Sequence, residues 1–192
     1  MNKLVGSLLL LLLAGCTGPA ETPPLAGARN GGPFRLTNQD GHAFTDRDLK
    51  GRWPIVYFGY TFCPDACPTD MAAIAGGLRQ VERDDPATAA KVVPVFVTVD
   101  PARDTPAVLK TFVRAFHPRA IGLTGPAAEI DRTATEYGVA HSLGPKAPDG
   151  AGYLVDHSRA AYLMGPDGAP IALAGADGGP AEVARTIEHW VR

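Results

Sequence analysis

The chain has 192 residues, with 18 Lys and Arg against 20 Asp and Glu, which gives a formal net charge of −2. A chain of this length can bury one hydrophobic core of ordinary size. The near balance of charges gives no argument for a nucleic-acid partner, and we predict that the protein binds none.

The first residues have the order of charge, apolar core and small residues that is typical of a secretory signal. Lys3 precedes the apolar run 4–14, which is too short to cross a bilayer as a helix of about 20 residues. The run ends in Leu13-Ala14-Gly15-Cys16, which resembles the lipobox of bacterial lipoproteins. The resemblance implies cleavage before Cys16 and attachment of lipid to its sulfur. An ordinary secretory signal, with Cys16 lost or left free, is the alternative.

These features predict a signal peptide over 1–15 and a lipid-anchored protein on the periplasmic side of the bacterial cell envelope. They do not distinguish the inner from the outer membrane. Residues 17–33 are rich in Gly, Pro and Ala and have no hydrophobic period. This composition is typical of a flexible linker, so we predict a membrane tether over 16–33 and a folded domain over 34–192.

From Phe34 onward, strand and helix patterns alternate. Short runs rich in β-branched, aromatic and aliphatic residues predict strands over 34–37, 55–60, 91–99, 121–123, 160–164 and 171–174. Apolar residues at helical spacing predict helices over 71–81, 106–116, 127–137 and 181–191. Thr105 can cap the second helix and Gly138 can close the third. Pro94 inside the predicted strand 91–99 weakens that prediction.

Strands that alternate with helices indicate an α/β fold, and a terminal hairpin around Pro166-Asp167-Gly168 adds antiparallel strands to the sheet. The order of strand, cysteine turn, helix, strand, helix, hairpin and helix is similar to the thioredoxin fold. We therefore predict a thioredoxin-like fold with an additional N-terminal hairpin and an inserted helix and hairpin.

Cys63 and Cys67 lie four residues apart, directly after an apolar run. A strand that feeds a helix there would place both sulfurs on one face at the helix N-terminus, where the helix dipole favours thiolate. With Cys16 assigned to lipid, these are the two remaining cysteines. A disulfide across four residues constrains the unfolded chain very little, which disfavours a stabilising role. The pair can instead form a redox disulfide or hold a soft metal ion.

A distant histidine could complete such a site. In a thioredoxin-like fold the loop before the strand 160–164 packs beside the cysteine turn, so we expect His157 to face Cys63 and Cys67. Two thiolates and one imidazole suit Cu(I), and Cu(II) could add an oxygen ligand or water. Zn²⁺ with a bound water is also compatible with the set. Taken alone, His157 could equally be a hydrogen-bonded loop histidine.

Three carboxylates lie near these residues in the sequence. Asp65, between the cysteines, could complement the helix N-terminus. Asp100 ends a predicted strand and could sit beneath the site or form a turn with Pro101. Asp156 could orient the ring of His157, a common device at metal sites, or could point away from it because neighbouring side chains often diverge.

Three separate motifs are similar to those of the Sco/SenC family of copper-delivery proteins. They are 58–68, Phe-Gly-Tyr-Thr-Phe-Cys-Pro-Asp-Ala-Cys-Pro; 97–106, Val-Thr-Val-Asp-Pro-Ala-Arg-Asp-Thr-Pro; and 155–158, Val-Asp-His-Ser. The resemblance runs from about Phe34 to the C-terminal helix. The chain departs from the family at Ala66, where a larger aliphatic residue is common, and over 141–152, which is short and rich in Gly and Pro.

The resemblance implies one copper, as Cu(I) or Cu(II) or both, bound by Cys63, Cys67 and His157. It implies work on the dinuclear copper centre of cytochrome c oxidase subunit II, with periplasmic copper carriers and thiol reductants as further partners. Members of the family are thought to deliver copper, to reduce the cysteines of that subunit with their own cysteine pair, or both. The sequence does not separate these roles.

Three other functions remain as alternatives. A metal-free thiol–disulfide oxidoreductase typically has the closer spacing Cys-x-x-Cys. A peroxiredoxin-like peroxidase has a Thr three residues before its reactive cysteine, whereas Thr61 is two before Cys63. A redox or copper sensor would use the same site and differ only in its partner.

Overall fold

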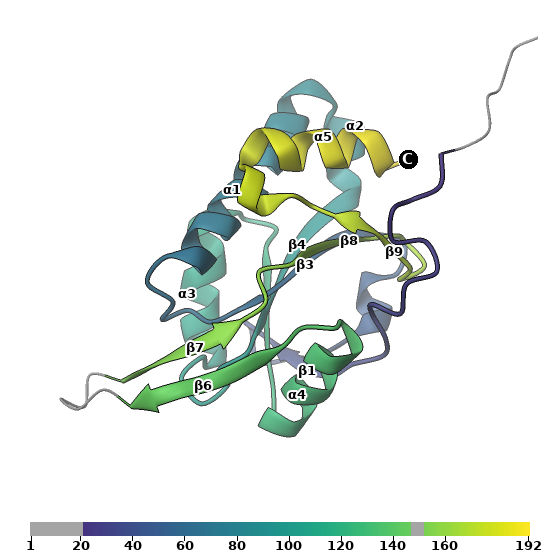
Figure 1. Cartoon of the computed structure of the whole chain (residues 1–192). Coiled ribbons are helices and arrows are strands. Elements are labelled where there is room, and N and C mark those ends of the chain that lie inside the picture. Colours follow the sequence, from purple (N-terminus) through teal and green to yellow (C-terminus); the bar gives the residue numbers. More distant parts are fainter. Residues whose placement is uncertain (1–20, 147–151) are drawn as a thin grey trace, which may run out of the picture.

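Figure 1 shows a computed structural model of the chain, which describes residues 21–146 and 152–192. The predicted signal peptide, Cys16 and the first residues of the predicted tether lie outside the described residues and stay predictions. None of the described helices combines the length and the apolar character needed to cross a membrane.

The described residues form strands, helices and two short 3₁₀ helices, and their bounds follow. The strands are β1 (Arg35–Asn38), β2 (Ala43–Thr45), β3 (Trp53–Gly59), β4 (Val92–Thr98), β5 (Ile121–Thr124), β6 (His141–Lys146), β7 (Tyr153–His157), β8 (Ala161–Met164) and β9 (Pro170–Leu173). The helices are α1 (Ala66–Asp84), α2 (Pro86–Lys91), α3 (Pro106–Phe116), α4 (Ala127–Glu136) and α5 (Pro180–Trp190), with η1 (Asp46–Leu49) and η2 (Ala176–Gly178) as the 3₁₀ helices.

A central sheet of seven strands, in the order β2-β1-β5-β4-β3-β8-β9, organises the domain. The strands β3, β4 and β5 are parallel, and the strands on either side of them pair in antiparallel fashion. The hairpin β6–β7 forms a separate sheet of two strands. The predicted α/β fold is confirmed, with β1–β2 as the additional N-terminal hairpin and α4 with β6–β7 as the insertion.

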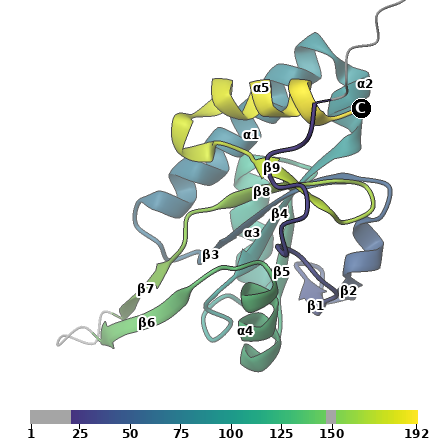
Figure 2. The same ribbon diagram turned by 45° about the vertical axis from the view of Figure 1, so that its right-hand side comes forward.

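The two faces of the central sheet are covered by different helices, as Figures 1 and 2 show. Neighbouring residues of β3 point to opposite faces because side chains alternate along a strand. Tyr57 donates a hydrogen bond to Asp70 of α1, while the ring of Phe58 packs on Tyr137, directly after α4. The helices α1 and α5 pack on each other on the first face, and α3 joins them there through the contact of Phe112 with the β4 residue Phe96.

Most predicted elements are found within a few residues of their expected ends. The predicted cap of α3 is confirmed, since the hydroxyl of Thr105 accepts a hydrogen bond from the amide of Val108. Pro94 does lie in β4, and it is tolerated because the pairing of β4 with β5 begins only at Val95. His157, which was expected in the loop before the strand 160–164, is instead the last residue of the strand β7, and the loop is limited to residues 158–160.

The predicted tether is wrong over its described part, residues 21–33. The amide of Leu25 donates to the carbonyl of Ile171 on β9, and the side chain of Asn30 donates to the carbonyl of Tyr137. Residues 21–33 form no helix or strand, but a composition rich in Gly and Pro carries no information about contacts with other parts of the chain. The folded domain therefore includes these residues.

A glycine in α1 sets how closely α1 and α5 approach. A Cβ on Gly77 would lie 2.6 Å from the Cβ of Val183 and 2.7 Å from the carbonyl oxygen of Pro180. These contacts are too short for real atoms, so the helices would have to separate.

We predict that Gly77→Ala destabilises the protein by about 1–2 kcal/mol, although alanine favours the helix by about 1 kcal/mol. The reason is the loss of packing between α1 and α5. Urea unfolding followed by circular dichroism measures the change. The control is Ala72→Gly at an exposed position of the same helix, which should cost about 1 kcal/mol from propensity alone. A Gly77→Ala variant more stable than the wild type would contradict the prediction.

Candidate metal centre

The two cysteines lie at the end of β3, but on different kinds of backbone. Cys63 belongs to the turn between β3 and α1, and Cys67 is in the first turn of α1. The expectation that both sulfurs share one helix face is therefore wrong, because the helix begins only at Ala66. The turn still brings them together, since the amide of Cys67 donates a hydrogen bond to the sulfur of Cys63 at 3.4 Å.

The environment makes the two thiols unequal. Burial opposes ionisation of Cys63, but hydrogen bonds from the amides of Cys67, Asp65 and Ala66 outweigh it and lower the pKa of Cys63. Cys67 is fully buried, and this burial raises its pKa to about 12, with the neighbouring Cys63 adding to the effect. The expected preference for thiolate thus holds for Cys63 and not for Cys67 in the metal-free protein.

A glycine makes room for the buried sulfur. A Cβ on Gly59, the last residue of β3, would lie 2.8 Å from the sulfur of Cys67 and 3.1 Å from ring atoms of Tyr57 and Phe96. The lack of a side chain at this position therefore leaves the space in which the Cys67 sulfur sits.

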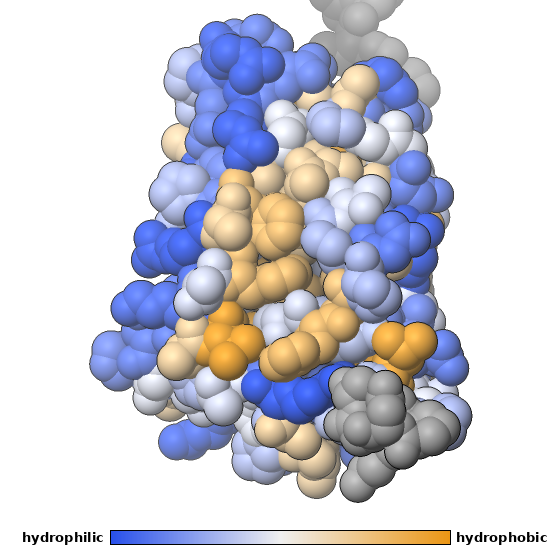
Figure 3. All heavy atoms as spheres, turned by 90° about the vertical axis from the view of Figure 1, so that its left-hand side faces the viewer, coloured by the Kyte–Doolittle hydropathy of each residue, from blue (hydrophilic) through white to orange (hydrophobic). Residues whose placement is uncertain are grey.

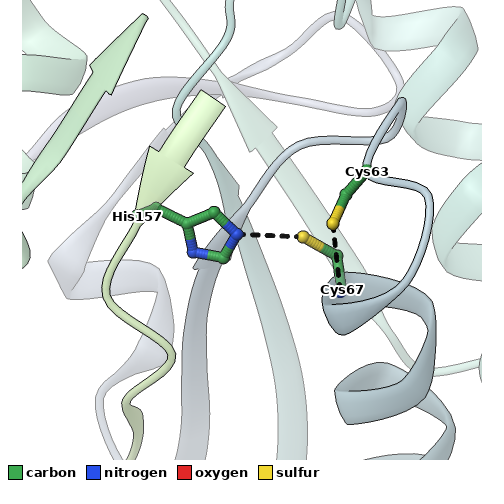
Figure 4. A group of neighbouring side chains, drawn as sticks. All are labelled: Cys63, Cys67 and His157. Carbon is green, nitrogen blue, oxygen red and sulfur yellow. Dashed lines mark hydrogen bonds between the residues drawn. The ribbon is translucent and has the colours of Figure 1, made fainter. Parts of the chain in front are cut away.

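His157, which is 90 residues from Cys67 in the sequence, completes the group (Figure 4). Its Nε2 atom lies 3.2 Å from the sulfur of Cys67, and its Nδ1 atom lies 3.0 Å from the carbonyl oxygen of Ser158. Because a carbonyl oxygen only accepts hydrogen bonds, Nδ1 carries the proton and Nε2 keeps a free electron pair in the neutral ring. That electron pair points at the sulfur, which is the orientation a metal ligand needs.

Two buried tyrosines hold the ring of His157. Tyr57 and Tyr60 each meet it edge-on, with centroids at 6.1 Å and 6.0 Å. The hydroxyl of Tyr57 donates to Asp70, and Arg159 in turn binds this carboxylate through two nitrogens.

A second polar cluster holds the other end of β7. The hydroxyl of Tyr153 donates to Asp100 at 2.8 Å, and Arg103 forms an ion pair with the same carboxylate. The guanidinium of Arg103 also lies over the ring of Tyr153, at 3.8 Å from its centroid. Asp100 also begins a turn with Pro101, the second of the two predicted possibilities, since its carbonyl accepts from the amides of Arg103 and Asp104. Through Tyr153 it supports the strand that carries His157.

None of the three carboxylates named from the sequence belongs to the metal-ligand group. Asp65 is exposed, and although it stands at the N-cap of α1 its side chain makes no capping hydrogen bond. Asp156 is exposed, and Nδ1 of His157 faces the carbonyl of Ser158. The possibility that Asp156 orients the ring is therefore wrong, because adjacent residues of the strand β7 point to opposite faces.

The three donors fit one soft ion. The ligand atoms of Cys63, Cys67 and His157 all lie within 4.8 Å of one another. Bonds of about 2.3 Å to sulfur and about 2.0 Å to nitrogen allow donors on one ion to be up to about 4.6 Å apart, so only small shifts are needed. Two sulfurs and one imidazole favour a soft ion such as Cu(I).

The sequence predicted these three residues but missed their supports. Gly59, Tyr57 and Tyr60 lie in or beside a strand that reads as ordinary core. Asp70 and Arg159 are 89 residues apart, so no local pattern connects them. One hint of these supporting residues was present in the sequence: Tyr57, Tyr60 and Arg159 are only a few positions away from a predicted ligand.

The cysteine turn and the strands β6 and β7 lie on the left in Figure 1, and Figure 3 shows this side of the molecule. A strip of apolar side chains runs down this face between hydrophilic borders. The turn exposes Phe62, and the hairpin exposes Leu143 and Leu154. The metal-ligand group is therefore bordered by an exposed apolar surface.

Comparison with known proteins gives one consistent result. The sequence model of the SCO1/SenC family matches residues 22–192. The mitochondrial SCO1 homologue of Homo sapiens is 38% identical over 162 residues, which are 84% of this chain and 53% of that protein. The chain thus spans about half the length of the curated relatives it matches.

Solved structures agree with this result. The copper-bound ScoI of Bradyrhizobium japonicum is 40% identical, has a TM-score of 0.74 and covers 84% of this chain and 99% of its own. Two structures at 26% identity are also similar. A SCO1/SenC family lipoprotein of Bacillus anthracis has a TM-score of 0.67 and covers 85% of this chain and 95% of its own. BsSco has a TM-score of 0.62 and covers 82% of this chain and 90% of its own. It is described as having a disulfide switch and as a member of the Sco family of cytochrome c oxidase assembly proteins.

The unequal thiols lead to a prediction for the reduced, metal-free protein. Iodoacetamide should modify Cys63 first, with a rate that rises at lower pH than for a free thiol of pKa about 8.5, because the thiolate reacts and its pKa is lowered. Cys67 should stay largely unmodified at pH 8, where its raised pKa and burial keep it a thiol. Mass spectrometry of the separate cysteine peptides measures both rates. Equal rates at Cys63 and Cys67 would contradict the prediction.

Proposed function

The chain belongs to the SCO1/SenC family, and we propose that it binds one copper ion through Cys63, Cys67 and His157 and delivers it during assembly of cytochrome c oxidase. The observation that carries this proposal is the convergence of two sulfurs and an imidazole nitrogen within 4.8 Å. Copper occupies the related structure from Bradyrhizobium japonicum, and BsSco belongs to a family of oxidase assembly proteins.

The recipient that we propose is the dinuclear copper centre of subunit II of the oxidase. Transfer of copper between proteins requires the recipient's own ligands to reach the ion before the donor's ligands leave. The half-buried Cys63 and the apolar side chains around it, such as Phe62, offer a surface on which a recipient could make that contact. Periplasmic copper carriers and thiol reductants would use the same surface.

We further propose that the protein is anchored in the bacterial cell envelope by lipid on Cys16, with the domain on the periplasmic side. The proposal is supported by the apolar run 4–14 and the Leu-Ala-Gly-Cys sequence that follows it. A related protein of Bacillus anthracis is described as a lipoprotein. More than one acyl chain would make the attachment stable, whereas a single chain holds a protein only marginally.

A second function, reduction of the cysteines of subunit II, is favoured by the unequal thiols. A partly exposed Cys63 with a lowered pKa is suited to attack a disulfide, and the buried Cys67 is suited to resolve the mixed disulfide. The two electrons and two protons would come from the Cys63 and Cys67 thiols, which end as a disulfide. His157 separates the two functions, because copper binding needs its nitrogen and thiol exchange does not. Reductase turnover that is unaffected by His157→Ala would favour the second function.

Copper binding gives the first test of the proposal. The reduced wild-type protein should bind one copper per chain, and either Cys63→Ser or Cys67→Ser should abolish this binding because each removes a sulfur ligand. His157→Ala should weaken it. At a free copper concentration about 100 times Kd, the wild type should gain about 2.7 kcal/mol in stability. Metal analysis, thermal unfolding and the thiolate charge-transfer band of bound Cu(II) measure these effects.

His42→Ala is the matched control for the histidine, since His42 is exposed and outside the ligand group. Retention of stoichiometric copper by either serine variant would show that the proposed site is not the binding site.

Delivery and anchoring are tested together in a strain that lacks the gene. The strain should lose cytochrome c oxidase activity and regain it with added copper, since excess copper replaces a delivery protein but not a reductant. Complementation with the wild type should restore activity without added copper. A Cys16→Ser protein should move from the membrane fraction to the soluble fraction. Normal oxidase activity in the deletion strain at low copper would contradict delivery, and a membrane-bound Cys16→Ser protein would contradict the lipid anchor.

A further inference from the structure

An ion pair links the two segments that carry the buried ligands. Asp70 lies on α1, nearly one helical turn after Cys67, and Arg159 lies two residues after His157. The guanidinium of Arg159 donates from Nη2 to Oδ1 of Asp70 at 2.7 Å and from Nε to Oδ2 at 3.1 Å. Such two-point contacts fix the relative orientation of both groups as well as their distance.

The carboxylate of Asp70 is fully buried and is satisfied from two sides. The hydroxyl of Tyr57 donates to Oδ2 at 2.9 Å, and the ring of the same tyrosine meets His157 edge-on. Arg159 reaches the carboxylate from the surface, where half of its side chain is exposed. One buried group on α1 is therefore connected both to the ring that packs on His157 and to the chain segment that follows His157.

The backbone does not provide this link. The strand β7 pairs with β6 in a separate sheet, and the amide of Ser158 also bonds toward that side, to the carbonyl of Ala140. No ladder of the central sheet therefore fixes His157 relative to α1 among the described residues. The direct contact from Cys67 to His157 and the ion pair from Asp70 to Arg159 are the side-chain interactions that join the two segments.

We propose that Asp70 and Arg159 are positioning residues, whose ion pair clasps the His157 segment to α1 and so keeps the imidazole beside Cys67 before copper arrives. Neither residue belongs to the group of ligand residues. The predicted effect of this ion pair on copper release rests on the proposed copper-binding function. The ion pair itself includes none of the three ligand residues and can be tested in the metal-free protein.

The test must separate loss of the clasp from loss of the fold. Removing Arg159 alone would leave the charge of Asp70 buried without a partner, which is strongly destabilising. The double substitution Asp70→Asn with Arg159→Met removes both charges together and keeps an oxygen that can accept from Tyr57. Arg185→Met is the matched control, because Arg185 also pairs with a carboxylate, that of Glu182, but on the exposed side of α5.

The first measurement uses NMR on the full-length, metal-free chain. The wild type and Arg185→Met should show nuclear Overhauser effects between the ring of His157 and the rings of Tyr57 and Tyr60, which the double variant should lose. Unchanged ring contacts in the folded double variant would overturn the clasp. The NMR result does not depend on copper. A wild type that binds no copper would refute the proposed function, and the ring contacts would still decide whether the ion pair positions His157.

The second measurement is the rate at which Cu(I) is lost to a chelator. The double variant should release copper about 10- to 100-fold faster than the wild type, which corresponds to the loss of metal affinity expected when supports of metal ligands are removed. In a His157→Ala background the double substitution should add no further increase, because the clasp acts through that ring. An unchanged release rate, or an equal increase in the His157→Ala background, would overturn the proposal.

A conservative variant covers the case in which the double variant does not fold. Arg159→Lys keeps a positive charge at Asp70 but replaces the two-point contact with a single donor. It should weaken the ring contacts and raise the release rate less than the double substitution. Ring contacts and a release rate equal to those of the wild type would show that the two-point contact does not position His157.

Discussion

The contact between Nε2 of His157 and the sulfur of Cys67, at 3.2 Å, is the constraint on which the site depends. It joins the helix α1 to the strand β7, which the central sheet does not include. The rings of Tyr57 and Tyr60 hold the imidazole from its sides, and the carbonyl of Ser158 leaves the electron pair on Nε2 free. These contacts hold the ligand atoms within 4.8 Å of one another, and holding ligands in place lowers the ordering cost of binding.

The same geometry explains why one pair of cysteines supports two kinds of chemistry. Cys63 lies in a turn with amides directed at its sulfur, so its pKa is lowered, whereas Cys67 fills a space beside Gly59 and remains a buried thiol. Exchange of a metal ligand and exchange of a disulfide both begin at an accessible thiolate. In the proposed roles, the need for His157 is what separates copper delivery from thiol reduction.

The central sheet positions the site by ending two parallel strands at one edge. The strand β3 leads into the cysteine turn, and β4 leads to Asp100, which anchors the β6–β7 hairpin through Tyr153. The contact of Asp100 with Tyr153 at the start of β7 and the ion pair of Asp70 with Arg159, two residues after its end, thus lie on either side of His157 along the chain. The β6–β7 hairpin forms no backbone pairing with the central sheet, so polar side chains attach it to the rest of the domain.

The sequence by itself determined the elements whose causes are local. The apolar run before Cys63 and the helical spacing from Met71 to Val81 each specify an element through neighbouring residues, and a resemblance of three motifs identified the three ligands. Only the tertiary structure decided how residues 21–33 pack, that Asp156 faces away from the ring, that Cys67 stays a thiol, and that Asp70 meets Arg159. Each of these depends on burial or on a contact between segments far apart in the chain, and a local pattern carries no record of either.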